Sequence, residues 1–299
     1  MYSVIDLRFQ DRPEIIAAYV VPGPAGVALV ETGPGSTVAQ LEAGLAQLGL
    51  RWRDITDVLV THIHLDHAGA VGHVARASRA RVYVHPVGAP HLLDPSRLLA
   101  SARRLYGEQM ETLWGEFLSV PGDRLHVVED GETIPAAGRR FRAVETPGHA
   151  RHHHAYLLDG LCFTGDIAGA RLPRQRHIRL PTPPPDIDLP AWHASLKRLH
   201  DLRPDALLLT HYGPVTSEPR RHLEAVGERL QAVAEFVYRR WQAGESVEAM
   251  IAAYSDWVAE QAKAEGADAD AVARYEVVVP SFMEILGLVR YFEKGGMPV

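Results

Sequence analysis

The chain has little cysteine, no long apolar run and no excess of positive charge, and each shortage excludes a class of protein. Cys162 is the single cysteine among 299 residues, which rules out an intramolecular disulfide framework and favours a reducing compartment. No stretch reaches the roughly 20 apolar residues that span a bilayer, and the first residues contain no apolar signal-peptide core. We therefore expect a cytoplasmic protein that does not associate with membranes.

The charge balance bears on the kind of partner. Lysine and arginine number 31 against 37 aspartate and glutamate residues, which gives a formal net charge of -6. Affinity for nucleic acid comes from Lys and Arg side chains that neutralise phosphates, and the sequence has no basic run to supply it. Hydrophobic residues at 46% and charged residues at 23% match ordinary globular proteins. The expected partner is a small-molecule substrate, and nucleic acid is not expected.

Short β-branched runs alternate with amphipathic stretches, which indicates an α/β fold. Apolar residues recur at helical spacing over 36–50 and again over 191–202. The other apolar runs are short and end in Gly, Pro or polar residues, as strands do. Strands are predicted at 15–22, 26–33, 57–62, 80–85, 124–134, 141–148, 155–160, 161–166 and 205–211.

Residues 1–218 are predicted to form one domain, and residues 219–299 a helical C-terminal extension. Two excursions interrupt the first domain: a helical insertion at about 90–118, and a loop at about 178–190 whose prolines exclude regular structure. Long excursions from an α/β scaffold often carry binding residues, so both are expected to line the substrate entrance. The alternative for the insertion is that its apolar face packs against the C-terminal helices or a second subunit. The apolar stripes of the extension indicate packing on the domain or a homodimer interface.

The densest polar cluster is the segment 61–67, Thr-His-Ile-His-Leu-Asp-His. It follows an apolar strand directly, so its four potential ligands sit at a strand's carboxyl end, where α/β proteins usually place their sites. Three imidazoles and a carboxylate so close together need hydrogen bonds or a metal if they are buried. A divalent cation would satisfy them together. The alternative is a polar loop whose histidines face water.

Three further segments also place a ligand-type residue after an apolar strand, which argues against a polar loop that only faces water. His149 comes shortly after the apolar run at 141–145, Asp166 after the run at 161–163, and His211 after the run at 205–209. Each of these ligand-type residues lies next to, or two residues from, a glycine. The sequence therefore predicts a metal centre whose ligands are His62, His64, Asp66, His67, His149, Asp166 and His211.

The motifs HxHxDH, GH, GD and a final H, in this order, resemble those of the metallo-β-lactamase-fold metallo-hydrolase superfamily, specifically its glyoxalase II and lactonase-like branch. The resemblance covers about residues 15–215. It implies a four-layer αββα sandwich with two metals at one edge between the sheets. It also implies the ligand sets: His62, His64 and His149 for one metal, Asp66, His67 and His211 for the other, and Asp166 as the bridge.

Imidazole and carboxylate ligands suit Zn, Mn or Fe, and zinc is the default choice. Two such ions can share a hydroxide and polarise the bond to be cleaved. The predicted function is metal-dependent hydrolysis of an ester-type bond, with a thioester or lactone preferred. A phosphodiesterase is one alternative, and a mononuclear iron oxidoreductase similar to the persulfide dioxygenases of the superfamily is another. A non-catalytic binding protein is the third.

Several residues outside the ligand set also enter the prediction. His153 is expected to line the pocket and, with Asp66, to take part in catalysis. Glu31-Thr32-Gly33 stands where the superfamily often has Asp-Thr-Gly, which puts in doubt any bond that the shorter side chain would make. His85 is expected either at the same edge or as a satisfied core histidine. Surface positions on helices are expected for His193, His200 and His222.

Overall fold

The computed structural model describes residues 1–298. Two compact units divide the chain, and each is made of segments that are distant in sequence. The first unit comprises Met1–Glu145 and His152–Gly165, and the second comprises Thr146–Arg151 together with the chain from Asp166 onward. No helix within residues 1–298 is long and apolar enough to cross a membrane.

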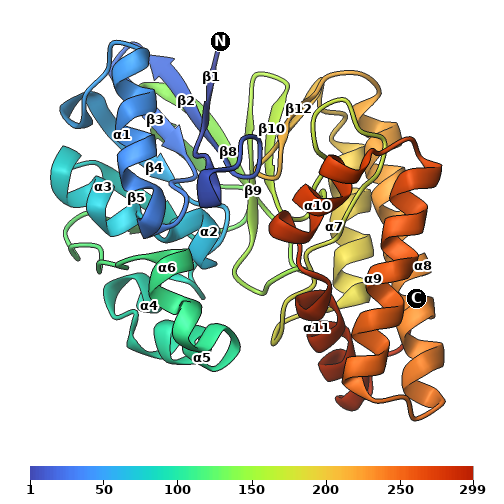
Figure 1. Ribbon diagram of the computed structural model, residues 1–299. Helices are drawn as coiled ribbons and strands as arrows, with labels where there is room; N and C mark the ends of the chain where they lie inside the picture. The colour runs from blue at the N-terminus through green and yellow to red at the C-terminus, as the bar shows by residue number, and fades with distance from the viewer. Residues whose placement is uncertain (299) are drawn as a thin grey trace. The chain divides into compact units, whose positions relative to one another are not determined.

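The first unit begins with a mixed sheet of order β1-β2-β3-β4-β5-β6 (Figure 1). Strands β1 to β3 pair antiparallel, and β3 to β6 pair parallel. Parallel strands bring their carboxyl ends to one edge, so the residues that follow β3, β4 and β5 share that edge. The bounds are β1 Ser3–Asp6, β2 Ala17–Gly23, β3 Gly26–Val30, β4 Ile55–Leu59, β5 Arg81–Val84 and β6 Leu125–Val127.

An antiparallel sheet packs against this one inside the first unit, with the order β10-β9-β8-β7. Its strands are β7 Thr133–Ala136, β8 Arg139–Glu145, β9 His154–Leu158 and β10 Leu161–Gly165. Tyr19 of β2 meets Phe163 of β10 edge-on at 5.5 Å, and the buried Tyr156 hydroxyl donates to the Val60 carbonyl at 3.0 Å. Burial of these aromatic side chains between the sheets supplies much of the apolar stabilisation.

Helices of the first unit are α1 Val38–Gln47, α2 Leu65–Ala68, α3 Val71–Ser78, α4 Ala89–Leu93, α5 Ser96–Tyr106 and α6 Met110–Trp114. The last three occupy the stretch predicted to be a helical insertion and lie together in Figure 1. Trp114 stacks on Phe9 with ring centroids 5.5 Å apart, and the Ser36 hydroxyl donates to the Leu113 carbonyl at 2.6 Å. The insertion is thus fixed to the N-terminal part of its own unit.

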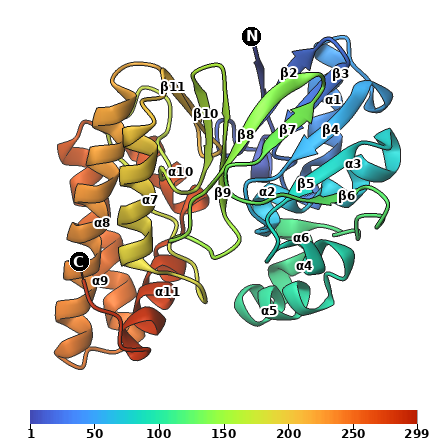
Figure 2. The same ribbon diagram turned by 180° about the vertical axis from the view of Figure 1, so that it is seen from behind.

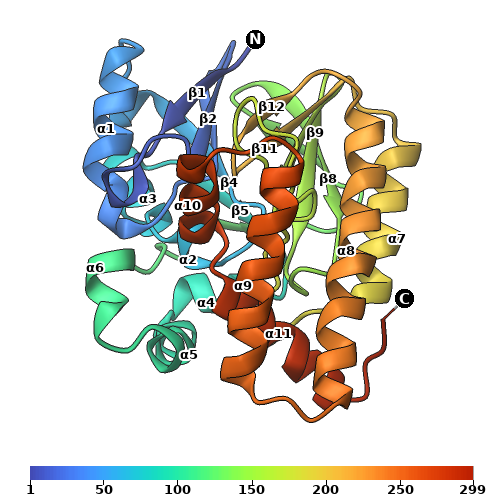
Figure 3. The ribbon, with the colours of Figure 1, turned by 45° about the vertical axis from the view of Figure 1, so that its right-hand side comes forward.

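The second unit combines an antiparallel strand pair, β11 Ala206–Leu209 and β12 Gly213–Val215, with five helices. The helices are α7 Leu189–Asp201, α8 Pro219–Gln242, α9 Val247–Ala264, α10 Ala269–Val278 and α11 Ser281–Glu293. Figure 2 shows α7 running beside α8, and Figure 3 shows α9 between α8 and α10. Helix α11 contacts both α8 and α9. Side chains of Asp188, Ser246 and Asp268 accept from the first-turn amides of α7, α9 and α10, as helix N-caps do.

The predicted α/β class with two sheets is confirmed, and the departures are local. The run at 124–134 is two short strands in different sheets, because Gly131 turns the chain with a φ of 75°. Strands β1 and β12 have four and three residues and carry too little pattern to be predicted. His222 was expected at the surface and this was wrong: it is 4% exposed in α8, beside the buried Leu223, and its Nε2 donates to the Ala168 carbonyl at 2.9 Å.

Burial of His222 makes the stability of the protein depend on pH. Desolvation lowers the pKa of His222 from 6.5 to about 4. Between these values the unfolded chain binds a proton that the folded side chain does not, so stability should fall by roughly 3 kcal/mol as the pH drops from 6.5 to 4. Glutamine at this position can still donate to Ala168 but does not titrate. Urea unfolding of the metal-free protein should therefore show a weaker pH dependence for His222→Gln than for the wild type, and equal slopes would contradict this assignment.

Candidate metal centre

Each ligand predicted from the sequence follows the end of a strand. His62 lies three residues after β4, and α2 begins at Leu65, so the chain turns sharply through His64 and puts Asp66 and His67 in the first turn of a helix. His149 follows β8, Asp166 follows β10 directly, and His211 follows β11. Strands β4, β10 and β11 are largely apolar and buried, and β8 buries Phe141, Ala143 and Val144, which fixes the positions from which the polar side chains extend.

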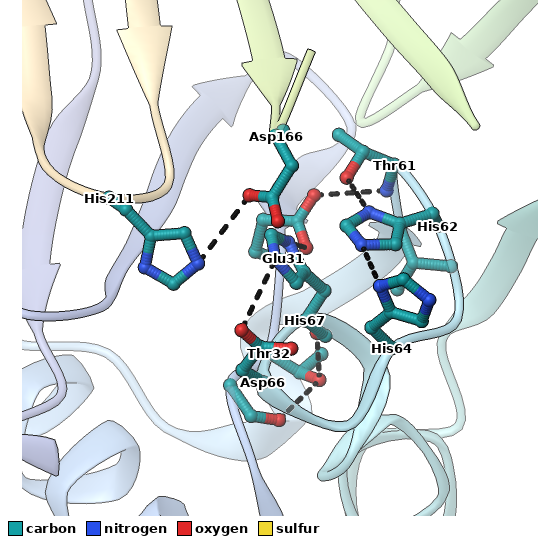
Figure 4. Close-up of polar contacts among 12 residues, drawn as sticks. Glu31, Thr32, Thr61, His62, His64, Asp66, His67, Asp166 and His211 are labelled. Carbon is teal, nitrogen blue, oxygen red and sulfur yellow. Dashed lines mark hydrogen bonds and ion pairs between the residues drawn. The ribbon is translucent and has the colours of Figure 1, made fainter. Parts of the chain in front are cut away.

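Three histidines of the HxHxDH segment gather within the first unit (Figure 4). Nε2 of His62 lies 3.0 Å from Nδ1 of His64, and the rings of His62 and His67 are 4.0 Å apart between centroids. Nε2 of His67 lies 3.7 Å from a carboxylate oxygen of Asp66. His62 and His67 are fully buried, whereas His64 and Asp66 are partly exposed. Two of these four side chains are therefore buried, and the other two reach solvent in part.

The Glu31-Thr32 turn at the end of β3 holds His67 from two directions. The Glu31 carboxylate accepts from the Thr61 amide at 2.9 Å with one oxygen and faces Nδ1 of His67 at 3.0 Å with the other (Figure 4). The amide and the hydroxyl of Thr32 both donate to the His67 carbonyl at 2.9 Å. Because a carboxylate only accepts, His67 carries its proton on Nδ1 and presents Nε2 as a lone pair.

Glu31 also has an uncommon backbone conformation. Its φ is 67°, in the left-handed region that non-glycine residues rarely adopt. Such a conformation costs of order 1–3 kcal/mol and persists only where the surroundings enforce it. The Glu31 carboxylate is longer than that of aspartate, and it reaches both the Thr61 amide and Nδ1 of His67. Glutamate in place of the usual aspartate therefore still puts a carboxylate against the HxHxDH segment.

In the second unit, the predicted ligand Asp166 lies between two others, His149 and His211. One of its carboxylate oxygens lies 3.4 Å from Nε2 of His149, and the other lies 3.5 Å from Nε2 of His211. Figure 4 shows the Asp166 carboxylate and the His211 ring facing one another. Nδ1 of His149 lies 2.7 Å from the Pro181 carbonyl, which only accepts, so His149 also presents Nε2 as a lone pair.

The backbone around His149 is fixed by α7. Gly148 has a φ of 136°, and a Cβ there would lie 2.3 Å from the Trp192 Cα atom. The Gly148 carbonyl accepts from the Asp188 amide at 2.9 Å, and the Ser195 hydroxyl donates to the Pro147 carbonyl at 2.6 Å. Only glycine combines this φ with so close an approach to the helix. The start of α7 thus places His149.

The separations between ligand atoms match those around a shared ion. Two atoms bound tetrahedrally at about 2.0–2.1 Å from zinc are about 3.3 Å apart. The four ligand pairs described above are separated by 3.0, 3.7, 3.4 and 3.5 Å. All four exceed the roughly 2.7–2.9 Å of a good charge-assisted hydrogen bond. Three groups, each with its ligand atoms within 4.8 Å of one another, could hold a metal ion: His62, His64 and His149; His62, His67 and Asp166; Asp66, His67 and His211.

Comparison with known proteins identifies the family of the chain. Residues 11–211 match the metallo-beta-lactamase superfamily, a span that contains every ligand described above. The chain belongs to this superfamily. Its members are mostly metal-dependent hydrolases, and the His and Asp clusters of this chain are suited to metal binding.

Particular members of the metallo-β-lactamase superfamily are similar over different lengths. A metallo-beta-lactamase fold-containing protein of Sulfurisphaera tokodaii is 31% identical over 208 residues, which is 68% of this chain and 75% of that protein. A metallo-beta-lactamase family protein of Thermus thermophilus shares the fold over 99% of this chain and 96% of its own, with a TM-score of 0.66 and 24% identity. A hydroxyacylglutathione hydrolase of Vibrio cholerae is 31% identical over 134 residues, 45% of this chain, and the chain spans only 40% of its length.

The remaining histidines next to the metallo-β-lactamase motifs have distinct surroundings. His153 is fully buried, with its ring 5.0 Å from that of His62. Nδ1 of His152 accepts weakly from the Ile63 amide at 3.4 Å. His85 lies 3.2 Å from the Glu145 carboxylate and accepts from the Val87 amide at 3.0 Å, which satisfies both ring nitrogens. His85 is therefore a satisfied core histidine, whereas His153 lies against His62 and the His152 ring lies 5.3 Å from that of His64.

Two groups that contact the predicted ligands could not be assigned from the sequence. The Pro181 carbonyl is a main-chain group, so no side-chain pattern marks it. The Thr61 hydroxyl lies 3.0 Å from Nδ1 of His62. The sequence does not indicate this contact, because Thr61 continues the pattern of a buried strand. Cys162 is fully buried, and burial raises the pKa of its thiol to about 12, so it is a small core residue and not a nucleophile.

Proposed function

We propose that the chain is a metal-dependent hydrolase that holds two divalent ions and cleaves an ester-type bond. The observation that carries the proposal is the spacing of the ligand atoms, which suits shared ions better than hydrogen bonds. His62, His64 and His149 would hold one ion, Asp66, His67 and His211 the other, and Asp166 would contact both. Zinc is the preferred ion for this donor set, with manganese or iron as alternatives.

Hydrogen-bond acceptors in the protein orient two of these histidines for metal binding. Bound divalent ions lower the pKa of water and polarise a carbonyl. Glu31 and the Pro181 carbonyl each fix a proton on Nδ1 of a histidine, which orients its Nε2 and raises its basicity. His153, buried beside His62, would form part of the pocket wall and contact the substrate. No protein nucleophile is required, which agrees with the buried state of Cys162.

The preferred substrate is a thioester or lactone of a small molecule. The similarity to a hydroxyacylglutathione hydrolase supports it, because that name denotes an acyl group carried by a thiol compound. The insertion contributes Tyr106, whose ring packs edge-on against Trp114 at 5.0 Å. Burial raises the pKa of Tyr106, and the negative charge of Asp66 adds to this rise, so the hydroxyl stays protonated and can donate. An apolar wall with one donor suits an acyl group better than a phosphate.

Metal analysis tests the proposal directly. After the protein is loaded with excess zinc and freed of unbound metal, elemental analysis should give two ions per chain. The loaded protein should then hydrolyse a thioester or lactone faster than a phosphodiester in a matched panel. One ion per chain despite excess metal would overturn the binuclear assignment, and iron as that single ion would favour the oxidoreductase alternative.

A further inference from the structure

The segment between Asp166 and α7 is anchored by one buried arginine. The amide and carbonyl of Arg179 pair with those of Ala170 at 2.9 and 2.8 Å, which closes residues 170–179 into a loop. The Arg179 side chain, 3% exposed, leaves this loop and enters the C-terminal helices. Its Nη1 donates to Glu276 at 2.8 Å, its Nη2 donates to the Val279 carbonyl at 2.8 Å, and its Nε donates to Glu284 at 3.1 Å.

Glu284 of α11 fixes the chain on both sides of Pro181. Its carboxylate binds Arg179, two residues before Pro181, through both Nε and Nη2. Its main-chain carbonyl accepts from the Thr182 hydroxyl, one residue after Pro181, at 3.2 Å. Gly287, one turn further along α11, leaves room for the chain, because a Cβ there would lie 1.8 Å from the Thr182 carbonyl oxygen. The Pro181 carbonyl is therefore held between two attachments to one helix.

This attachment matters because the Pro181 carbonyl is the group that faces Nδ1 of His149 at 2.7 Å. The partner of a ligand's second ring nitrogen sets the tautomer and the direction of the ring, and its loss typically costs 10–100-fold in metal affinity. A displacement of the carbonyl by a fraction of an ångström would weaken this bond. The described contacts thus run from α11 through Arg179 and Thr182 to Pro181, and from there to the ligand.

Stability alone does not account for an ion pair at this place. Replacing a buried ion pair by apolar residues of similar volume is often neutral or stabilising, because the pair must be taken out of water. Glu284 is fully buried and has the Tyr254 hydroxyl as a further donor, at 2.7 Å. A directional network fixes the path of a chain more narrowly than apolar contact does, because each bond constrains an angle as well as a distance.

We propose that Arg179, held by Glu284 and Glu276, is a positioning residue for the metal ligand His149, and that the C-terminal helices thereby form a working part of the metal centre. The proposal rests on the proposed function, in which His149 binds a metal. It gives the helical extension a role that its apolar stripes alone do not indicate.

The test compares Arg179→Met with the double variant Arg179→Met/Glu284→Met. The single variant leaves Glu284 buried without its cation and should lose both stability and zinc affinity, the latter by about 10–100-fold at one of the two ions. The double variant should regain thermal stability, because an apolar pair replaces the ion pair. If Arg179 positions the ligand, the zinc affinity of the double variant stays low. If affinity returns together with stability, Arg179 acts only through folding and the proposal is overturned.

Two further measurements separate this proposal from the proposed function. The Nδ1 proton of His149, observed by NMR in the metal-free protein, should give a slowly exchanging signal in the wild type that is lost or shifted in the double variant. An unchanged signal would overturn the positioning role whether or not the protein hydrolyses any substrate. Tyr254→Phe is the matched control: it removes a bond to Glu284 but leaves the Arg179 and Thr182 attachments intact, so zinc affinity and the His149 signal should stay normal.

Discussion

Asp166→Ala should abolish hydrolysis and remove most of the bound metal. Asp166 faces His149 with one carboxylate oxygen and His211 with the other, so its loss affects the surroundings of two further predicted ligands. In the proposed function Asp166 contacts both ions, so its removal should forfeit several kcal/mol of metal-assisted stabilisation, and about 4 kcal/mol corresponds to roughly a thousandfold in rate. Elemental analysis after gel filtration, together with turnover on the preferred substrate, measures both effects.

His153→Ala is the comparison that makes the Asp166 result informative. His153 is equally buried but lies beside His62 and belongs to none of the three possible ligand groups. The alanine variant should keep nearly normal metal content and lose turnover by about tenfold, as expected for a residue outside the ligand set. The reverse ranking, with metal lost in the His153 variant and kept in the Asp166 variant, would show that ligand and neighbour had been confused.

Glu31→Gln should weaken metal binding by about 10–100-fold although the side chain keeps its size. Glu31 serves two donors, the Thr61 amide and Nδ1 of His67, with one oxygen each. Glutamine offers only one oxygen, so its amide group must face one of these donors and leave it unsatisfied, at a cost of about 1–3 kcal/mol. Competition with a chromophoric chelator measures affinity, and urea unfolding of the metal-free protein measures stability.

Glu31→Asp provides the control for charge and for reach. Aspartate keeps both acceptor oxygens but is shorter by one methylene, and it tolerates a left-handed backbone better than most residues. It should therefore retain more metal affinity than the glutamine variant. Wild-type affinity in the glutamine variant would mean that the carboxylate charge is dispensable, and the proposed support of a metal ligand by Glu31 would have to be abandoned.

The sequence predicted the elements whose signal is local. The strands that end before His62, Asp166 and His211 are short apolar runs, and the polar residue after each one marks its end. The ligand types in these motifs carry chemistry that does not depend on knowing the fold. For this reason the family and the two-sheet architecture could be inferred before any coordinates, and both are confirmed.

What the sequence could not supply depends on contacts across long separations. His222 follows a surface-type pattern of charged neighbours, and only the packed register of α8 shows that it points inward to Ala168. The reach of Glu31 to His67 depends on a left-handed backbone angle that no propensity favours for glutamate. The support of His149 by Pro181 joins a side-chain atom to a main-chain atom 32 residues away. Such contacts are set by tertiary packing and not by local preference.

The close approach of Gly148 to Trp192 has a consequence for protein engineering. Because the main chain before His149 lies against the first turn of α7, the ligand loop and that helix can only be transplanted as one piece. A loop grafted alone onto another scaffold would keep the sequence of the motif but lose the contacts with α7 that orient His149. The Trp192 ring also packs edge-on against His149 at 5.7 Å, and its Nε1 donates to the Ile167 carbonyl at 2.8 Å. Libraries that randomise Trp192 should therefore return few metal-binding clones, even though Trp192 contributes no ligand atom.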